Sequence, residues 1–330
     1  ADPLFTSVYT GLPGGMVLTL TGIGMLATAG SFPMLIVAAC VVGLGSATFH
    51  PEASRVARMG SGGRFGTAQS MFQVGGNTGS AIGPLLAAAI VVPFGQPAIA
   101  WFMLIALLAI VVLWQLSRWS ARHGQAQIRK LASQQPPPLD RATVIRAIAV
   151  IAVLMFAKFV YTASITNYFT FYLMERFGIS LRDSQLYLFM FLAAVAAGTF
   201  AGGPVGDRIG RKAVIWVSFL GVAPFALLLP HASLFWTAVL VILIGLIMSS
   251  AFSAMVVYAQ EAVPGRVGLV SGLMFGLMFG LGGMAAAGLG QLADQHGIVR
   301  VYQWCAWLPL LGLATALLPR TQPAVVLRKA

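Results

Sequence analysis

The stretch "GGPVGDRIGRK" (Gly202–Lys212) is a short polar segment that stands between two long apolar runs. Four of its eleven residues carry a charge, although only 8% of the 330-residue chain is charged. Hydrophobic residues make up 58% of the chain, more than the roughly 45–50% typical of soluble domains. The stretch therefore interrupts a sequence that is suited to lipid rather than to water.

Apolar runs recur along the whole chain, each close to the ~20 residues that cross about 30 Å of hydrocarbon. Backbone groups in lipid must pair internally, so runs of this length are helices rather than barrel strands. We identify ten such runs, and the sequence thus predicts an all-α polytopic membrane protein. The runs cover residues 12–29, 33–57, 66–93, 97–117, 143–173, 184–204, 212–229, 233–260, 266–290 and 299–318.

The distribution of cations predicts the orientation of the chain. If ten spans alternate across the membrane, sixteen of the 20 Lys and Arg residues fall on one side. Arg176, Arg182 and Arg300 fall on the other side, and Lys158 lies inside a span. Such an excess marks the cytoplasm, so the polar linker and the C-terminal tail are predicted to be cytoplasmic. The net charge of +12 then reflects topology and contact with anionic lipid, not nucleic-acid binding.

One internal segment predicts the domain organisation. "SARHGQAQIRKLASQQPPPLDRA" (residues 120–142) is polar, basic and proline-containing, which is typical of a linker. It separates an N-terminal bundle at 1–119, with four spans, from a C-terminal six-helix bundle at 143–330. "FHPEA" (49–53) and "YAQEA" (258–262) end apolar runs that are six spans apart. Six-helix repeats are one architecture of secondary transporters, so the N-terminal bundle is expected to lack two spans.

The pattern within Gly202–Lys212 resembles the signature cytoplasmic loop of the major facilitator superfamily. The matching positions are Gly203, Asp207, Arg208, Gly210, Arg211 and Lys212. The glycines permit a tight turn with close helix packing, and the cations hold the loop at the inner face. Asp207 can pair with these cations or with a helix N-terminus of the opposite half. A merely basic loop explains the cations but not the Gly/Asp spacing, so we interpret the segment as a gating loop.

Two longer segments, residues 43–88 and 257–276, resemble the bacterial fosmidomycin-resistance exporters of that superfamily. The resemblance implies a two-bundle fold of twelve helices, of which ten are expected here. It also implies proton-coupled export of a drug or small anionic metabolite by a monomer in the bacterial inner membrane. Two departures accompany the resemblance: the first two helices with their loop are expected to be absent, and Ala39 stands where an arginine is common in the fourth helix. The alternatives are a truncated, transport-inactive membrane remnant and anion uptake by the same fold.

Two acidic residues and a histidine are candidates for proton coupling. His50 and Glu52 end the second span, near the inner hydrocarbon boundary. Glu52 can pair with Arg55 or Arg58 on the same helix, which would be a structural role. Alternatively His50 or Glu52 carries protons, because histidine titrates near physiological pH. Glu261, the counterpart of Glu52 in the repeat, has the same two interpretations.

Lys158 is a candidate for binding an anionic substrate. It lies about 24 Å along the helix that begins near residue 143. A lysine in a span costs roughly 2.5–3.5 kcal/mol on insertion scales, so we expect it to face a water-filled cavity. Tyr161 and Tyr168 follow on the same span and add a polar-tipped aromatic face. The alternative is a lysine that extends toward the membrane surface without a function.

A polar stripe in the third span is a further substrate-binding candidate. Gln69, Gln73 and Asn77 are spaced at i, i+4 and i+8, so they share one helix face that is unsuited to lipid. Hydrogen bonding between helices is the alternative interpretation of this face.

The same span carries Gly79-x-x-x-Gly83-Pro84, which resembles the antiporter motif of the fifth helix of the superfamily. Ala87 and Ala88 replace the final glycines of that motif. Small residues at these positions allow close helix approach and a bend.

Nothing in the sequence resembles an enzyme. It contains no phosphate-binding glycine loop with a lysine, no Cys/His metal spacing and no nucleophile elbow. We therefore expect no cofactor, and the expected partners are membrane lipid, a small-molecule substrate and protons.

Overall fold

The computed structural model describes residues 3–133 and 140–319, and the described residues form helices and turns without a strand. The first range contains α1 (Pro3–Thr28), α2 (Phe32–Met59), α3 (Phe65–Leu86), the π-helical turn η1 (Ala87–Val91), α4 (Val92–Phe94), the 3-10 helix η2 (Gln96–Trp101) and α5 (Phe102–Ser133). The second range contains α6 (Arg141–Phe177), α7 (Leu181–Ile209), α8 (Arg211–Leu220), α9 (Ala223–Leu228), η3 (Leu229–His231), α10 (Leu234–Ala262), α11 (Val267–His296), α12 (Ile298–Cys305) and the 3-10 helix η4 (Leu308–Leu317).

Eight helical stretches among the described residues are long and apolar enough to cross a membrane. They correspond to eight of the ten predicted spans, so the protein is an all-α multi-pass membrane protein.

The other two predicted spans are helical but differ from the expectation. The run at 66–93 forms α3, η1 and α4, and the glutamines, asparagine and glycines of α3 lower its hydropathy below that of the eight stretches. The run at 299–318 is divided, because the α-helix ends at Cys305 and a 3-10 helix with Pro309 near its start replaces it. A sequence window averages hydropathy and therefore does not detect such a break.

The described chain divides into two compact units. Unit 1 comprises the described residues within 1–60, 79–135 and 265–275, and unit 2 comprises those within 61–78, 136–264 and 276–330. The first part of α3 thus belongs to unit 2, while the first part of α11 belongs to unit 1. The boundaries expected at the 120–142 linker remain a prediction, and residues 134–139 of that linker lie outside the described residues.

Glycines allow α1 and α2 of unit 1 to pack closely. A Cβ built on Gly15 of α1 would lie only 2.8 Å from the carbonyl oxygen of Gly45 on α2. Small residues let helix backbones approach in lipid, where van der Waals contact drives helix association. At the far end of α1, the Gln96 side-chain amide donates to the carbonyls of Leu26 and Ala29 at 2.9 and 2.8 Å. Gln96 thereby satisfies carbonyls that the end of α1 leaves open.

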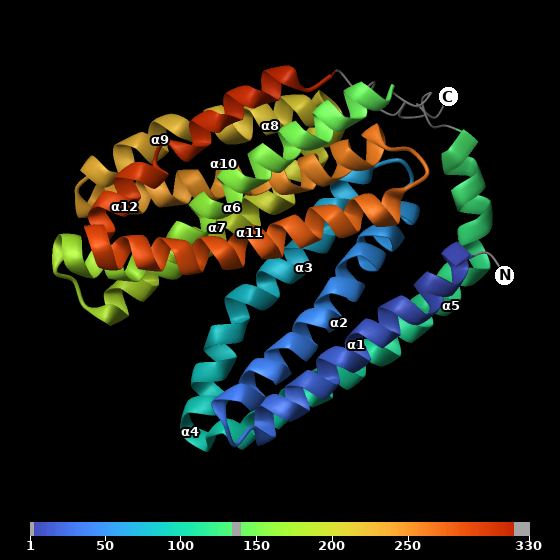
Figure 1. Cartoon of the computed structure of the whole chain (residues 1–330), viewed down its shortest axis with the longest axis horizontal. Helices are drawn as coiled ribbons and strands as arrows, with labels where there is room; N and C mark the ends of the chain where they lie inside the picture. The colour runs from blue at the N-terminus through green and yellow to red at the C-terminus, as the bar shows by residue number, and fades with distance from the viewer. Residues whose placement is uncertain (1–2, 134–139, 320–330) are drawn as a thin grey trace. The chain divides into compact units, whose positions relative to one another are not determined.

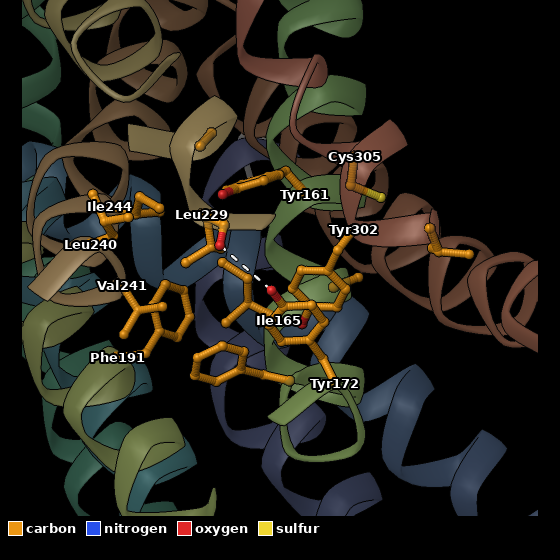
Figure 2. Close-up of a cluster of buried hydrophobic side chains, with 14 of the residues drawn as sticks. Tyr161, Ile165, Tyr172, Phe191, Leu229, Leu240, Val241, Ile244, Tyr302 and Cys305 are labelled. Carbon is orange, nitrogen blue, oxygen red and sulfur yellow. Dashed lines mark hydrogen bonds between the residues drawn. The ribbon is translucent and has the colours of Figure 1, made fainter. Parts of the chain in front are cut away.

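Unit 2 is built around α6 and α10. In Figure 1, α10 lies beside α7 and α8, and α6 lies beside α12. The helix α6 also packs against η4. Figure 2 shows buried side chains of α6, α7, α10 and α12 that form its core, with Tyr172 and Tyr302 stacked at 4.3 Å between ring centroids. The Tyr302 hydroxyl donates to the Ser164 carbonyl at 2.7 Å. This core fixes the face of α6 on which Lys158 lies.

Local signals set the ends of α6. The Asp140 carboxylate accepts a hydrogen bond from the Thr143 backbone N–H at 3.0 Å and caps the N-terminus. Hydrogen bonds from Thr143 hold the pKa of this exposed carboxyl below its usual value. Gly178 ends the helix with a left-handed φ of 66°, a conformation that glycine adopts without steric cost.

Candidate functional site

The Gly202–Lys212 loop joins α7 to α8 through one sharp turn. Gly210 adopts a φ of 93°, outside the region open to ordinary L-residues, and this turn ends α7 at Ile209 and starts α8 at Arg211. The turn therefore requires the glycine that the motif supplies.

Asp207 caps the N-terminus of α3. Its carboxylate accepts hydrogen bonds from the backbone N–H groups of Gly66 and Thr67 at 2.9 and 2.8 Å, and from the Thr67 hydroxyl at 2.6 Å. The first N–H groups of a helix have no partner within the helix, and its positive dipole end favours an anion. The structure thus shows Asp207 bound to a helix N-terminus, one of the two pairings expected from the sequence.

Close packing between α3 and α7 explains why the motif has a glycine at position 203. A Cβ built on Gly66 would lie 2.8 Å from the Gly203 carbonyl oxygen, and both glycines are buried. Because neither glycine carries a side chain, α3 and α7 can approach closely enough for Asp207 to reach the first turn of α3.

Arg211 supplies the second pairing of Asp207. One guanidinium nitrogen lies 2.7 Å from an Asp207 carboxylate oxygen, and the other lies 3.5 Å from a Glu261 carboxylate oxygen. Glu261, a candidate for proton coupling, is therefore joined through Arg211 to the loop. The remaining cations differ, since Arg208 is exposed while the Lys212 ammonium donates to the Ala316 carbonyl at 3.2 Å and to the Leu318 carbonyl.

Lys158 is enclosed by protein. Its side chain is 6% exposed, and its ammonium donates to the carbonyls of Met248 and Ser249 on α10 at 3.0 and 3.3 Å. The ring centroids of Phe159 and Phe252 lie 5.8 and 6.0 Å from the ammonium nitrogen. Within the described residues, no carboxylate forms an ion pair with Lys158. The sequence predicted a water-filled cavity around Lys158. In the structure protein encloses the ammonium instead, and main-chain carbonyls accept its hydrogen bonds.

The tyrosines of α6 do not form one continuous polar face. The Tyr161 side chain is 2% exposed and its hydroxyl has no hydrogen-bond partner among the described residues. The Tyr168 hydroxyl donates to the Ala286 carbonyl of α11, and Tyr172 donates to the Leu229 carbonyl at 3.5 Å (Figure 2). Of these tyrosines, only Tyr161, one turn from Lys158, has an unused donor.

The polar stripe of α3 contributes to helix packing. The side-chain amide of Asn77 donates to the Thr199 hydroxyl on α7 at 2.9 Å. Gln69 is 3% exposed, and Gln73 is partly buried. The structure thus shows, for Asn77, the interhelical hydrogen bond that was the alternative interpretation of this stripe.

The antiporter-like motif lies in a different environment. A Cβ built on Gly79 or Gly83 would meet no atom within 4 Å, so these glycines do not mark a close helix approach in the described chain. The helix continues through Pro84 and changes to the π-helical turn at Ala87.

The proton-coupling candidates of α2 lie in unit 1. The Glu52 carboxylate is 3.3 Å from the Arg55 guanidinium, which is the structural pairing considered for it. The His50 Nδ1 atom lies 3.0 Å from the Ser46 hydroxyl oxygen, and its ring packs 5.3 Å from the Phe275 ring centroid. His50 thus lies beside the part of α11 that belongs to unit 1.

Comparisons with known proteins identify the family. Residues 9–287 match the Major Facilitator Superfamily. The chain belongs to this superfamily. It is 58% identical over 308 residues to the "Fosmidomycin resistance protein" of Escherichia coli (strain K12), covering 93% of this chain and 76% of that protein. It is 43% identical over 314 residues to the "Uncharacterized MFS-type transporter YfnC" of Bacillus subtilis (strain 168), covering 94% and 77%.

A solved structure supports the fold. The major facilitator transporter FucP in its outward conformation superposes with a TM-score of 0.75 at 13% identity, covering 95% of this chain and 84% of that chain. At this identity the likeness concerns the fold alone, and it agrees with an all-α major facilitator architecture.

Sequence reasoning missed the partners of the loop. Gly66 and Thr67, which bind Asp207, lie in the 43–88 segment that carries the resemblance to the exporters. A glycine and a threonine at the start of an apolar run are a signal for a helix N-terminus. The sequence offered a helix N-terminus of the opposite half as a partner for Asp207, but it did not indicate which helix this would be.

Proposed function

We propose that this major facilitator protein is a secondary active exporter of small anionic compounds such as the phosphonate fosmidomycin, driven by proton entry. The structural observation that supports a transport cycle is the Asp207 cap on α3. Its bonds join two helices through groups that can separate without unfolding either helix. The similarity to a fosmidomycin resistance protein supports the substrate class.

In the proposed cycle the loop acts as a gate. While Asp207 holds the first turn of α3, the contact of α3 with α7 is closed at this end. When the cap opens, Asp207 keeps its pairing with Arg211, and Arg211 keeps Glu261 as a second partner. Protonation of Glu261 would remove one of the two anions that Arg211 bridges, which couples proton uptake to the gate. Glu52 and His50 are the corresponding candidates on α2.

Lys158 is the proposed binding residue for the substrate anion. Its ammonium is held by carbonyls in the middle of α10, which also serve the hydrogen bonds of the helix itself. A phosphonate offers charged oxygens as stronger acceptors than these carbonyls. Tyr161 has an unused hydroxyl one turn away and would donate to the same anion. Lys158 would therefore exchange two shared acceptors for a charged partner.

Energy for export would come from the proton gradient and the membrane potential. Each positive charge that moves inward across 100 mV releases about 2.3 kcal/mol. This amount corresponds to a concentration ratio of about fifty, because each 1.4 kcal/mol is a factor of ten.

The direction of transport is tested in inside-out membrane vesicles with labelled fosmidomycin. An exporter concentrates the phosphonate inside such vesicles when their lumen is acidified, and a protonophore abolishes the accumulation. Anion uptake by the same fold predicts the reverse, with accumulation only in right-side-out vesicles. A transport-inactive protein gives no accumulation in either preparation.

The proposed location is the bacterial inner membrane, with the linker and the C-terminal tail in the cytoplasm. Reporter domains fused after Gln134 and Lys329 should both report the cytoplasm, because the cation excess lies on that side. Both positions lie outside the described residues. A periplasmic signal from either fusion would reverse the orientation. Purified protein should behave as a monomer in detergent.

A further inference from the structure

Helix α8 begins with two cationic residues, although positive charge at a helix N-terminus is electrostatically unfavourable. Arg211 and Lys212 are its first two residues, where the positive end of the helix dipole repels a cation. Arg211 is compensated by Asp207 and Glu261. Lys212 donates instead to the carbonyls of Ala316 and Leu318, at the end of η4.

The end of η4 is a favourable place for this ammonium. The last carbonyls of a helix have no partner within it, and the negative end of its dipole attracts a cation. A third hydrogen bond comes from α10, because the buried Tyr258 hydroxyl donates to the Pro319 carbonyl at 2.7 Å. We call these bonds from Lys212 and Tyr258 to residues 316–319 the η4 anchor.

The packing of α8 against η4 places Lys212 at this position. Lys212 and Phe219 are seven residues apart and lie on one face of α8. A Cβ built on Gly312 of η4 would lie 3.0 Å from the Phe219 Cγ atom, so the two helices are in close contact there. The glycine contact and the anchor thus hold η4 along the length of α8.

We propose that Lys212 is a positioning residue that ties the end of η4 to the gating loop. Arg211 and Lys212 are adjacent in the first turn of α8, and they connect in different directions. Arg211 leads through Asp207 to the first turn of α3, whereas Lys212 leads to the end of η4. Release of Asp207 from α3 therefore shifts the first turn of α8, and the η4 anchor transmits this shift to residues 316–319.

A spin label at Leu317, which is 60% exposed, reports the anchor directly in the purified protein. The background carries Cys40→Ala and Cys305→Ala, since these are the two cysteines of the chain. Lys212→Met removes the donor and keeps the length of the side chain, and Tyr258→Phe removes one hydroxyl. We expect Lys212→Met to raise the ratio of mobile to immobile label about tenfold, the order expected for loss of a charge-assisted hydrogen bond. Lys212→Arg should restore the parental ratio.

Coupling to the gate is tested with the same label and Asp207→Asn. We expect greater label mobility at Leu317 although Asp207 does not contact η4, while Asp294→Asn, at an exposed aspartate near the end of α11, leaves it unchanged. Export by Lys212→Met should show a lower kcat at unchanged KM. Parental mobility in either Lys212→Met or Asp207→Asn would overturn the proposal. If Lys212→Met does not fold, Tyr258→Phe decides the anchor with the same readout.

The role of the anchor in export rests on the proposed function, whereas its effect on label mobility does not. If the parent fails to export the phosphonate, the proposed function fails while the mobility result still decides the anchor. If the parent exports and Lys212→Met exports with parental kcat, the positioning role is overturned while the proposed function stands.

Discussion

Asp207 and Lys158 are both charged side chains held inside unit 2 by main-chain groups, and the two sites differ in what those groups lack. Asp207 binds N–H groups in the first turn of α3, which have no partner in their own helix. Lys158 binds carbonyls in the interior of α10, which already accept the bonds of that helix. Asp207 also has Arg211 beside it, whereas Lys158 has no ion-pair partner among the described residues.

The difference lies in how completely the hydrogen-bonding capacity of each charged group is satisfied. A cap that satisfies open donors with an opposite charge is strong, and breaking it requires a conformational step. A buried ammonium that shares its acceptors with a helix has incompletely satisfied hydrogen bonds, and a bound anion would lower the free-energy cost of burying its charge. The comparison therefore supports the proposed gating role of Asp207 and the proposed binding of the substrate anion by Lys158.

The largest effect is expected at Lys158. Lys158→Met and Lys158→Ala should abolish phosphonate export, while Lys158→Arg retains part of it because arginine keeps the charge. Lys158→Met should also keep or raise the thermal midpoint in detergent, since it removes a buried charge that lacks an ion-pair partner. Export at the parental rate by Lys158→Ala, or a clear loss of stability in Lys158→Met, would make Lys158 a structural residue.

A smaller effect is expected at Asp207. Asp207→Asn removes the charge from hydrogen bonds that contribute roughly 1.5–3 kcal/mol each, so export turnover should fall about 10- to 100-fold. The amount of protein in the membrane should stay near the parental level. Asp294→Asn is the matched control, because its exposed carboxylate lies away from the loop. Equal turnover of Asp207→Asn and the control would remove the gating role.

The α3–α7 contact should respond to a single methyl group. Gly203→Ala places a Cβ against α3 and should lower stability by about 1–3 kcal/mol, the usual cost of overpacking. Gly276→Ala, at a helical glycine with open space around its added Cβ, is the control and should leave the thermal midpoint unchanged. A parental midpoint for Gly203→Ala would show that the two helices do not approach this closely.

The smallest effect is expected at Asn77. Asn77→Ala removes one interhelical hydrogen bond, and such bonds in membranes contribute about 0.6 kcal/mol on average. We expect a slight fall in the thermal midpoint and export within about threefold of the parent. An effect on export as large as that of Lys158→Ala would return Asn77 to the substrate site.

Several features of the fold and the site were predictable because they depend on local sequence. The apolar runs located eight of the described spans, and the Gly/Asp spacing located the turn at Gly210. Other features depend on distant contacts and were not predictable. The pairing of Asn77 with Thr199 and the enclosure of Lys158 both arise from packing between helices.

The sequence by itself determined that this protein resides in a membrane, which superfamily it resembles and which charged residues need an explanation. Hydropathy and charge act residue by residue, so these conclusions require no knowledge of contacts. Only the tertiary structure decided the partners, such as Gly66 and Thr67 for Asp207, or Met248 and Ser249 for Lys158. Backbone donors and acceptors occur at almost every position, so the approach of particular helices selects which of them a charge meets.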